Sequence, residues 1–197
     1  MKIVFAGGGT GGHLMAGLSI AQEISSRFPN TRVIFFGTNR NKESRYIEES
    51  NYEFKPIMAC KPTSFIRLPL FAFASLIGII HSLINLFIIK PDIIIGLGGY
   101  GSALPVVAAY IIGIPIVLIE PNVIPGRANL KMERWADAVL CHWESSKKRF
   151  KKGEVAVTGV PIRSGILENQ TEVDNNPFGL DSQKKTLLIM GGSQGAQ

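Results

Sequence analysis

A glycine-rich stretch near the N-terminus carries the residues best suited to chemistry. Residues 6–13 read Ala-Gly-Gly-Gly-Thr-Gly-Gly-His; they follow the apolar run Ile3-Val4-Phe5 and precede a segment, 14–24, whose apolar residues recur at helical spacing. The glycines therefore lie at a strand-to-helix turn. Backbone N–H groups at the positive end of a helix attract anions, and glycine lets a ligand approach closely. We expect this loop to bind phosphate, with the imidazole of His13 pointing toward the bound group.

The same glycines fit more than one kind of site. A dinucleotide fingerprint needs the spacing G-x-G-x-x-G between a strand and a helix, and three residues supply it: Gly7, Gly9 and Gly12. An NAD site also needs an acidic residue after the second strand, and none follows residues 33–36. Arg40 and Arg45 could instead accommodate the 2′-phosphate of NADP, so an NADP-binding oxidoreductase is an open alternative. A P-loop is excluded because no Gly-Lys-Ser/Thr follows the glycines. A purely structural helix–strand contact is the third interpretation.

Composition narrows the class of protein. The chain has 197 residues, of which 46% are hydrophobic and 18% charged, as in an ordinary globular protein, and its length suggests one domain and part of another. Its net charge of +6 suits an anionic membrane surface or a phosphorylated substrate. We expect no nucleic-acid partner, because aromatic residues do not interleave with a basic stripe. Cys60 and Cys141 are isolated and fit reduced thiols in a cytosolic protein without a signal peptide.

Alternating apolar segments predict an α/β fold with a doubly wound parallel sheet, Rossmann-like in type. The expected strands are 1–5, 32–37, 52–57, 93–97, 115–119, 138–140 and 155–157, and the expected helices after the first are 42–50, 68–89, 103–112, 127–135 and 144–150. In such sheets ligands gather at the carboxyl ends of the strands. Three segments should meet there: the glycine loop 7–13, a second glycine loop 98–102, and residues 120–122.

The segment 68–89 contains no charged residue and is flanked by Arg67 and Lys90. It is long enough to span a bilayer. However, a small or polar stripe recurs at helical spacing, formed by Ser75, Gly78, Ser82 and Asn85, and the segment leads directly into a buried strand. We expect a helix that packs partly on the sheet and partly on a membrane surface; a wholly buried helix and a membrane span are the alternatives.

The C-terminal part of the sequence changes in character. A basic run, residues 147–152, fits either a solvated helix end or a contact with anionic lipid. Residues 164–185 have the composition of a linker, and 186–190 predict a strand followed by another glycine loop. The expected organisation is one domain over residues 1–163, a linker over 164–185, and the start of a second domain over 186–197.

Five collinear motifs resemble the MurG family, the peptidoglycan N-acetylglucosaminyltransferases of GT-B fold. They are Gly8–His13, Lys90-Pro91-Asp92 with Gly98-Gly99-Tyr100, Gly113-Ile114-Pro115 with Glu120 and Asn122, Gly159 with Pro161 and Arg163, and Gly191–Ala196. The resemblance implies an inverting enzyme of peptidoglycan synthesis that transfers N-acetylglucosamine from UDP-GlcNAc to the C4 hydroxyl of muramic acid in lipid I, giving lipid II. It implies that this sequence is the N-terminal half, inactive alone, because in the family a second domain supplies most contacts to the nucleotide sugar.

The resemblance also implies roles for individual residues. His13 is the expected general base or orients the acceptor diphosphate, and Glu120 is the rival base, unless its carboxylate is simply satisfied by backbone donors. The expected substrate contacts are Thr10, Gly11 and Gly12 to the donor sugar or acceptor diphosphate, Asn122 to the sugar, and Arg163 and Ser193 to UDP. The guanidinium of Arg163 suits phosphate, although an interdomain salt bridge is its alternative. No cofactor and no metal is expected.

Members of the family are held at the cytoplasmic face of the cell membrane as peripheral proteins. The residues that would contact the membrane here are Phe65, Ile66, Leu68, Leu70, Phe71 and Phe73, with Lys61 and Arg67 meeting lipid phosphates. The sequence departs from the family pattern at four positions: Ala16, Ile119, Pro121 and Val160. These departures keep a second class of function open, a non-catalytic module that binds polyprenyl diphosphate or serves as a scaffold.

Overall fold

The computed structural model describes residues 1–7, 11–38, 43–58, 68–162, 179–181 and 183–189. The chain divides into two compact units, Met1–Pro161 and Ile162–Gln197. All the helices and strands of the described residues belong to the first unit, which therefore carries the architecture that positions the site.

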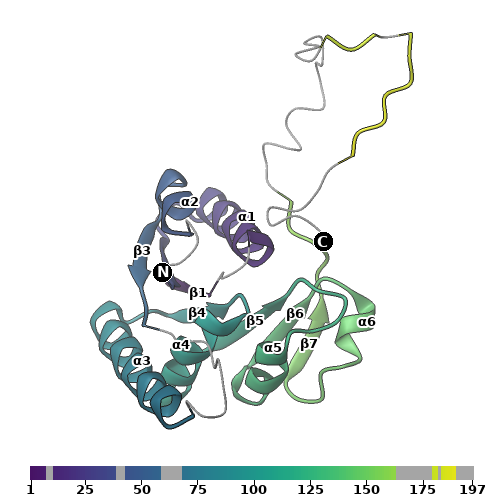
Figure 1. Ribbon diagram of the computed structural model, residues 1–197. Helices are drawn as coiled ribbons and strands as arrows, with labels where there is room; N and C mark the ends of the chain where they lie inside the picture. Colours follow the sequence, from purple (N-terminus) through teal and green to yellow (C-terminus); the bar gives the residue numbers. More distant parts are fainter. Residues whose placement is uncertain (8–10, 39–42, 59–67, 163–178, 182, 190–197) are drawn as a thin grey trace. The chain divides into compact units, whose positions relative to one another are not determined.

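The first unit is built on a seven-stranded sheet in which every neighbouring pair is parallel. Its strands are β1 Lys2–Ala6, β2 Arg32–Gly37, β3 Glu53–Pro56, β4 Ile93–Gly96, β5 Ile116–Glu120, β6 Ala138–Cys141 and β7 Glu154–Val157. Their order is β3-β2-β1-β4-β5-β6-β7 (Figure 1). The chain winds outward from β1 to β3 and then restarts on the other side of β1 with β4. This confirms the doubly wound fold and puts the topological switch point between β1 and β4.

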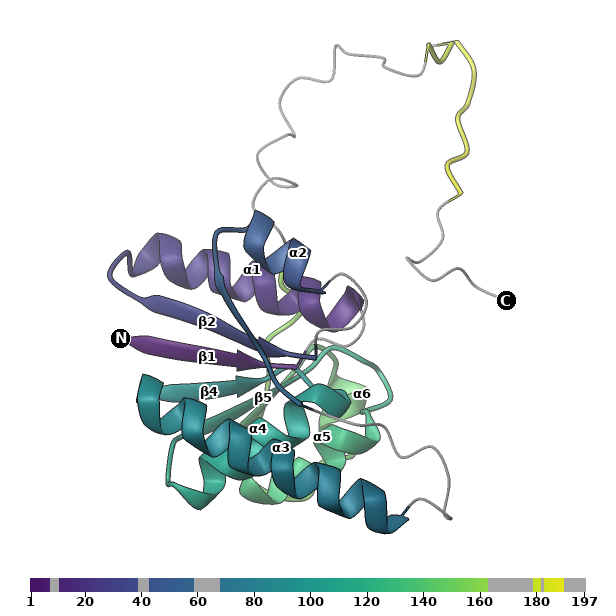
Figure 2. The same cartoon turned by 60° about the vertical axis from the view of Figure 1, so that its left-hand side comes forward.

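Helices cover both faces of the sheet (Figures 1 and 2). They are α1 Gly11–Arg27, α2 Glu43–Glu49, α3 Leu68–Ile89, α4 Tyr100–Ile111, α5 Arg127–Met132 with the 3₁₀ turn η2 Glu133–Trp135, and α6 Glu144–Lys147. Figure 2 shows α1 and α2 on one face and α3, α4 and α5 on the other. A sheet covered in this way needs strands that are apolar on both faces, which explains their continuous runs of valine, isoleucine and phenylalanine.

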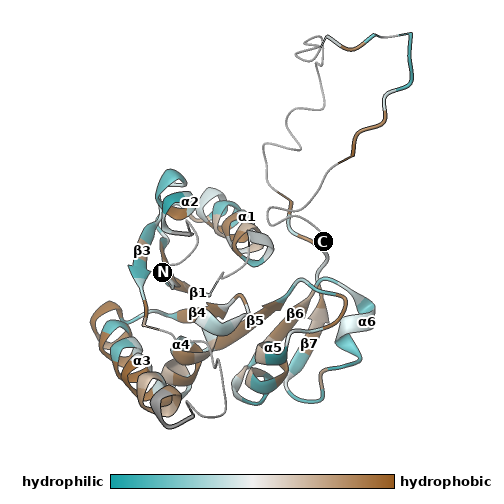
Figure 3. Cartoon of the chain, in the orientation of Figure 1, coloured by the Kyte–Doolittle hydropathy of each residue, from teal (hydrophilic) through white to brown (hydrophobic). Residues whose placement is uncertain are grey.

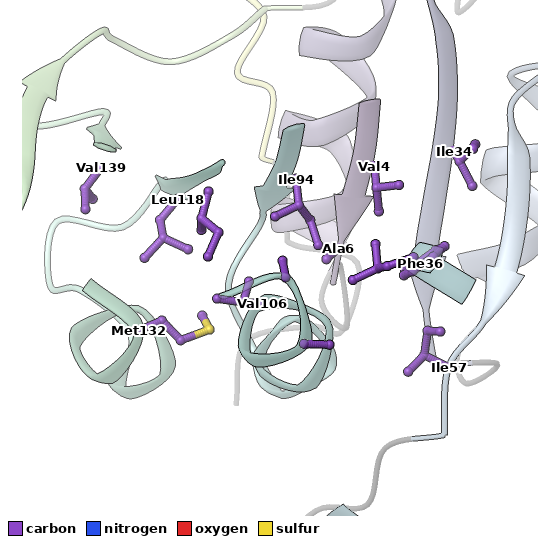
Figure 4. Packing of buried hydrophobic residues seen from close by; sticks show 14 of the residues in the cluster. Val4, Ala6, Ile34, Phe36, Ile57, Ile94, Val106, Leu118, Met132 and Val139 are labelled. Atoms are coloured by element: carbon purple, nitrogen blue, oxygen red, sulfur yellow. The ribbon is translucent and has the colours of Figure 1, made fainter. Parts of the chain in front are cut away.

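Alternate residues of five strands, β1, β2, β4, β5 and β6, enter two separate cores. Val4 of β1 belongs to the cluster that packs against α3, α4 and α5 (Figure 4). Its neighbour Phe5 belongs to the opposite cluster, with Leu14 and Leu18 of α1, and stacks on Phe35 at a centroid distance of 4.9 Å. Because Leu14 and Leu18 are buried, α1 is held in one orientation on the sheet, and this fixes the side of the helix on which His13 lies.

Helix α3 has the predicted bounds and two different apolar faces. Leu86 and Ile89 are buried in the core, and a Cβ on Gly78 would collide with the carbonyl oxygen of Met58, so glycine lets the helix approach the preceding segment. Most residues of α3 are apolar (Figure 3). The face opposite the core is exposed; its large apolar residues, hereafter the α3 stripe, are Phe73, Leu76, Ile77, Ile80, Ile84, Phe87 and Ile88. By length and composition, Phe71–Ile89 could cross a membrane: its mean hydropathy is 2.2, and 22% of it is buried.

Four expectations differ from the structure. Helix α4 begins at Tyr100 rather than at residue 103, so its first turn lies within the predicted second glycine loop 98–102. Helix α1 begins at Gly11, three residues before the predicted periodic segment. Helix α6 ends at Lys147 rather than Phe150, because the following turn buries the Phe150 side chain and directs the Lys151 N–H to the Glu133 carboxylate. The predicted strand 186–190 is wrong for its described residues, 186–189, which are exposed and irregular; no neighbouring strand of the described residues pairs with them.

Candidate functional site

Two glycine loops meet at the carboxyl ends of β1 and β4. Gly7 has φ +102°, and a Cβ there would lie 2.7 Å from the Gly98 carbonyl oxygen and 2.8 Å from the Ser102 Cβ. Gly98 and Gly99 also have positive φ and lead into α4. Only glycine at position 7 permits this approach and this backbone conformation without strain. The two loops therefore come into contact at the switch point, where open α/β sheets bind ligands.

His13 lies in the first turns of α1, half-buried, and its ring reaches the end of β5. Its Nε2 is 3.3 Å from the Nδ2 of Asn122. Burial lowers the pKa of His13 below its usual value, and the Glu120 carboxylate opposes part of that shift. The surroundings therefore favour the neutral imidazole, the form that can accept a proton or a hydrogen bond.

Glu120, the last residue of β5, is fully buried and accepts four hydrogen bonds. Its Oε1 accepts from the Asn122 backbone N–H and side-chain Nδ2, both at 2.9 Å, and its Oε2 accepts from the Gly126 N–H at 2.9 Å and the Asn129 Nδ2 at 3.0 Å. These bonds fold residues 121–126 into a loop around the carboxylate. The geometry fits the alternative expectation for Glu120, in which N–H donors of the protein itself satisfy the carboxylate. Proton abstraction by Glu120 stays a prediction.

Sequence reasoning missed two residues of this cluster. Asn129 of α5 is buried, and its Nδ2 also donates to the Ile119 carbonyl at 2.9 Å. His142 follows β6, and its backbone N–H donates to the Glu120 carbonyl at 3.0 Å. Its side chain is 6% exposed, and its pKa is lowered by burial, raised in part by Glu120 and lowered again by His13. The sequence did contain a signal for His142, because this polar residue comes two positions after the predicted strand 138–140 and so belongs to the carboxyl edge.

The structure brings three of the predicted site residues together: His13, Glu120 and Asn122. Gly11 and Gly12 begin α1 beside them. Thr10, Arg163 and Ser193 lie outside the described residues, as does Cys60. Within the described part of the chain, no group of three or more His, Cys, Asp or Glu residues could hold a metal ion.

The predicted membrane residues are only partly described. Phe65, Ile66 and Arg67, with Lys61, lie outside the described residues, and for Leu68 and Leu70 only the helical backbone of α3 is described. Phe71 is half-buried, with its ring 5.9 Å from that of Tyr100, whereas Phe73 is 62% exposed. Among the described side chains of α3, the exposed large apolar ones run from Phe73 to Ile88.

The profile of the glycosyltransferase family 28 N-terminal domain matches residues 3–141. The N-acetylglucosaminyltransferases of Thermodesulfovibrio yellowstonii and Bacillus subtilis, named as UDP-N-acetylglucosamine–N-acetylmuramyl-(pentapeptide) pyrophosphoryl-undecaprenol N-acetylglucosamine transferase, are each 35% identical over 201 residues. Both alignments cover 100% of this chain and 54% of the relative. The chain therefore spans about half the length of the curated relatives it matches.

A solved structure shares the fold. The crystal structure of Acinetobacter baumannii MurG superposes with a TM-score of 0.69 at 23% identity, over 82% of this chain and 46% of that one. At this identity the match supports the architecture alone, whereas the profile match covers well over half of the sequence. This chain is a member of glycosyltransferase family 28, and residues 3–141 are its N-terminal domain.

Proposed function

We propose that this chain provides the acceptor-binding half of an inverting glycosyltransferase that moves N-acetylglucosamine from UDP-GlcNAc to lipid I, forming lipid II. The relatives that match its whole length bear the name of that reaction. The chain alone is proposed to bind the acceptor and to be inactive in transfer, since it spans only about half of those relatives.

The observation that carries this proposal is the imidazole at the switch point. His13, in a neutral-favouring environment, lies at the carboxyl edge where two glycine loops meet and where the Glu120 carboxylate orders the neighbouring loop. Inversion requires a base for the acceptor hydroxyl and donors for a diphosphate. His13 fits the first task, and the backbone N–H groups at the start of α1 fit the second.

The test is titration of the 197-residue chain with a soluble lipid I analogue and, separately, with UDP-GlcNAc, followed by calorimetry. We expect saturable binding of the analogue and only weak binding of UDP-GlcNAc. In Gly12→Asp the analogue should bind at least tenfold more weakly, because the substitution places a carboxylate at the start of α1 beside the diphosphate. Gln22→Asp, on an exposed position of the same helix, is the matched control. A folded chain that binds UDP-GlcNAc but not the analogue would refute the acceptor role.

We also propose that the α3 stripe rests on an anionic membrane surface. Seven large apolar side chains form one face of a single helix, and such a patch on a monomeric protein marks an interaction site. On the same helical layer, Tyr110 and Ile111 are exposed. A cavity of about 430 Å³ around Trp135 is lined by three cations and one carboxylate: Lys131, Arg134, Lys152 and Glu133. Apolar side chains beside cations suit the boundary between acyl chains and lipid phosphates.

Co-sedimentation with phosphatidylglycerol vesicles tests the membrane proposal. We expect the chain to pellet with these vesicles, the double variant Phe87→Gln/Ile88→Gln to remain largely in the supernatant, and Phe28→Gln to behave as wild type, because Phe28 is equally exposed but lies beyond the end of α1. Equal binding of all three proteins would contradict docking through α3.

Two rival functions make different predictions. A non-catalytic module would be retained by liposomes that contain polyprenyl diphosphate more than by plain anionic vesicles, yet would give no transfer even when joined to the second half of a family member. An NADP-binding oxidoreductase would quench NADPH fluorescence on titration. Family 28 membership favours the transferase over the oxidoreductase, and a flat NADPH titration would remove that alternative.

A further inference from the structure

We infer that Asn122 is a positioning residue that determines which ring nitrogen of His13 is able to accept a proton. The Asn122 Nδ2 lies 2.9 Å from the Glu120 Oε1 and 3.3 Å from the His13 Nε2. One side-chain amide therefore links the buried carboxylate to the imidazole.

The orientation of the Asn122 amide follows from its partner. An ionised carboxylate can only accept, so the Asn122 atom that faces Glu120 must be the nitrogen. That nitrogen carries two hydrogens, and the second is available to His13.

The tautomer of His13 follows in turn. If Asn122 donates to Nε2, then Nε2 must present its lone pair, and the single proton of the neutral ring must be on Nδ1. Free imidazole side chains in water favour the other tautomer, with the proton on Nε2. The protein therefore holds His13 in its less common neutral form, and the nitrogen left able to accept a proton is Nε2.

Asn122 is suited to this task because its own position is fixed. Its backbone N–H donates to the same Glu120 oxygen at 2.9 Å, and that carboxylate is anchored by Gly126 and Asn129. The 3.3 Å contact to His13 is at the long end for an N–H donor, so a stronger donor can replace it at small cost. The catalytic meaning of this inference rests on the proposed function. In that function, the acceptor hydroxyl is the donor that replaces Asn122 at the His13 Nε2.

Nitrogen NMR of the imidazole rings tests the inference directly. The chain contains three histidines, so long-range ¹H–¹⁵N correlation spectra of the 197-residue chain are simple, and His81 on α3 serves as an internal control. We expect His13 above its pKa to show the Nδ1-protonated pattern. In Asn122→Ala and in the nearly isosteric Asn122→Leu the pattern should shift toward Nε2 protonation, because neither side chain can donate to Nε2. His81 should not change.

The outcomes separate this inference from the proposed function. Nε2-protonated His13 in the wild-type chain, or an unchanged His13 pattern in both variants, overturns the positioning role whatever the chain binds. The expected tautomer in a chain that fails to bind the lipid I analogue would leave the positioning role intact and refute the acceptor role. Circular dichroism of each variant confirms that the exposed position 122 tolerates the change.

Discussion

Replacing Glu120 with glutamine tests whether one buried carboxylate organises the carboxyl edge of the sheet. Glutamine has nearly the same shape but offers one acceptor oxygen and one NH₂ group. Because each carboxylate oxygen accepts from two N–H donors, the NH₂ group must face two donors wherever it is placed. Two hydrogen bonds are lost, and two N–H donors at the carboxyl edge are left without this acceptor.

The expected loss of stability follows from those two bonds. A hydrogen bond to a charged acceptor contributes about 1.5–3 kcal/mol, so the gross loss is roughly 3–6 kcal/mol. Removing a buried charge also removes its desolvation penalty, which offsets part of this loss. We therefore expect the free energy of unfolding to fall by about 2–4 kcal/mol.

Urea denaturation at pH 7.5, followed by circular dichroism, measures this change. Glu23→Gln is the control, because Glu23 forms an exposed i,i+4 ion pair with Arg27 and such a pair contributes at most about 0.5 kcal/mol. A loss below about 1 kcal/mol in Glu120→Gln, comparable with the control, would refute the view that the carboxylate holds the loop. A change in the slope of unfolding free energy against urea concentration would show that the variant alters more than the hydrogen bonds of Glu120.

Three further predictions concern the same unit. Gly7→Ala should lower the unfolding free energy by more than about 1 kcal/mol, since position 7 has positive φ and faces the Gly98 carbonyl; an unchanged melting temperature would contradict this. Leu86→Ala should cost about 2–5 kcal/mol and Phe87→Ala under about 0.5 kcal/mol in urea denaturation, because only the first is buried; similar losses would place the wrong face of α3 in the core. Burial lowers the pKa of His142, so as pH falls the unfolded chain takes up this proton before the folded chain does. The free energy of unfolding should therefore fall below about pH 6.5, by no more than about 1.4 kcal/mol per pH unit for this group. His142→Gln should flatten the plot of stability against pH measured from pH 7.5 to 5, and parallel plots for the two proteins would refute the buried neutral imidazole.

Element positions could be predicted well where an apolar run had clear ends. Strand β2 and helix α3 have the predicted bounds because charged residues, glycine or proline delimit them in the sequence. Where the end of an element depends on a distant contact, prediction was less accurate. The end of α6 is the example, since burial of Phe150 decides where that helix stops.

The site could be predicted only in part, because adjacency in a sheet is a property of the fold. Local pattern indicated the glycine loops, His13, Glu120 and Asn122, each directly after a strand or at a helix start. It could not reveal that Asn129 donates to Glu120, because that bond joins a helix to the strand before it by their packing. For α3, almost every residue is apolar, so the sequence could not show which face would be exposed.

The α3 stripe and the candidate site are related by the direction of the helix. In a doubly wound sheet each helix runs opposite to the strands, so α3 begins at the carboxyl edge and ends before β4. The ring contact between Phe71 and Tyr100 joins the first turn of α3 to the start of α4, directly after the second glycine loop. If α3 rests on lipid as proposed, its stripe starts close to the edge that carries His13. A diphosphate attached to a membrane-embedded polyprenyl chain could then reach the glycine loops while the polyprenyl chain stayed in the bilayer. An apolar surface on any other face of the unit would not place the carboxyl edge of the sheet beside the membrane in this way.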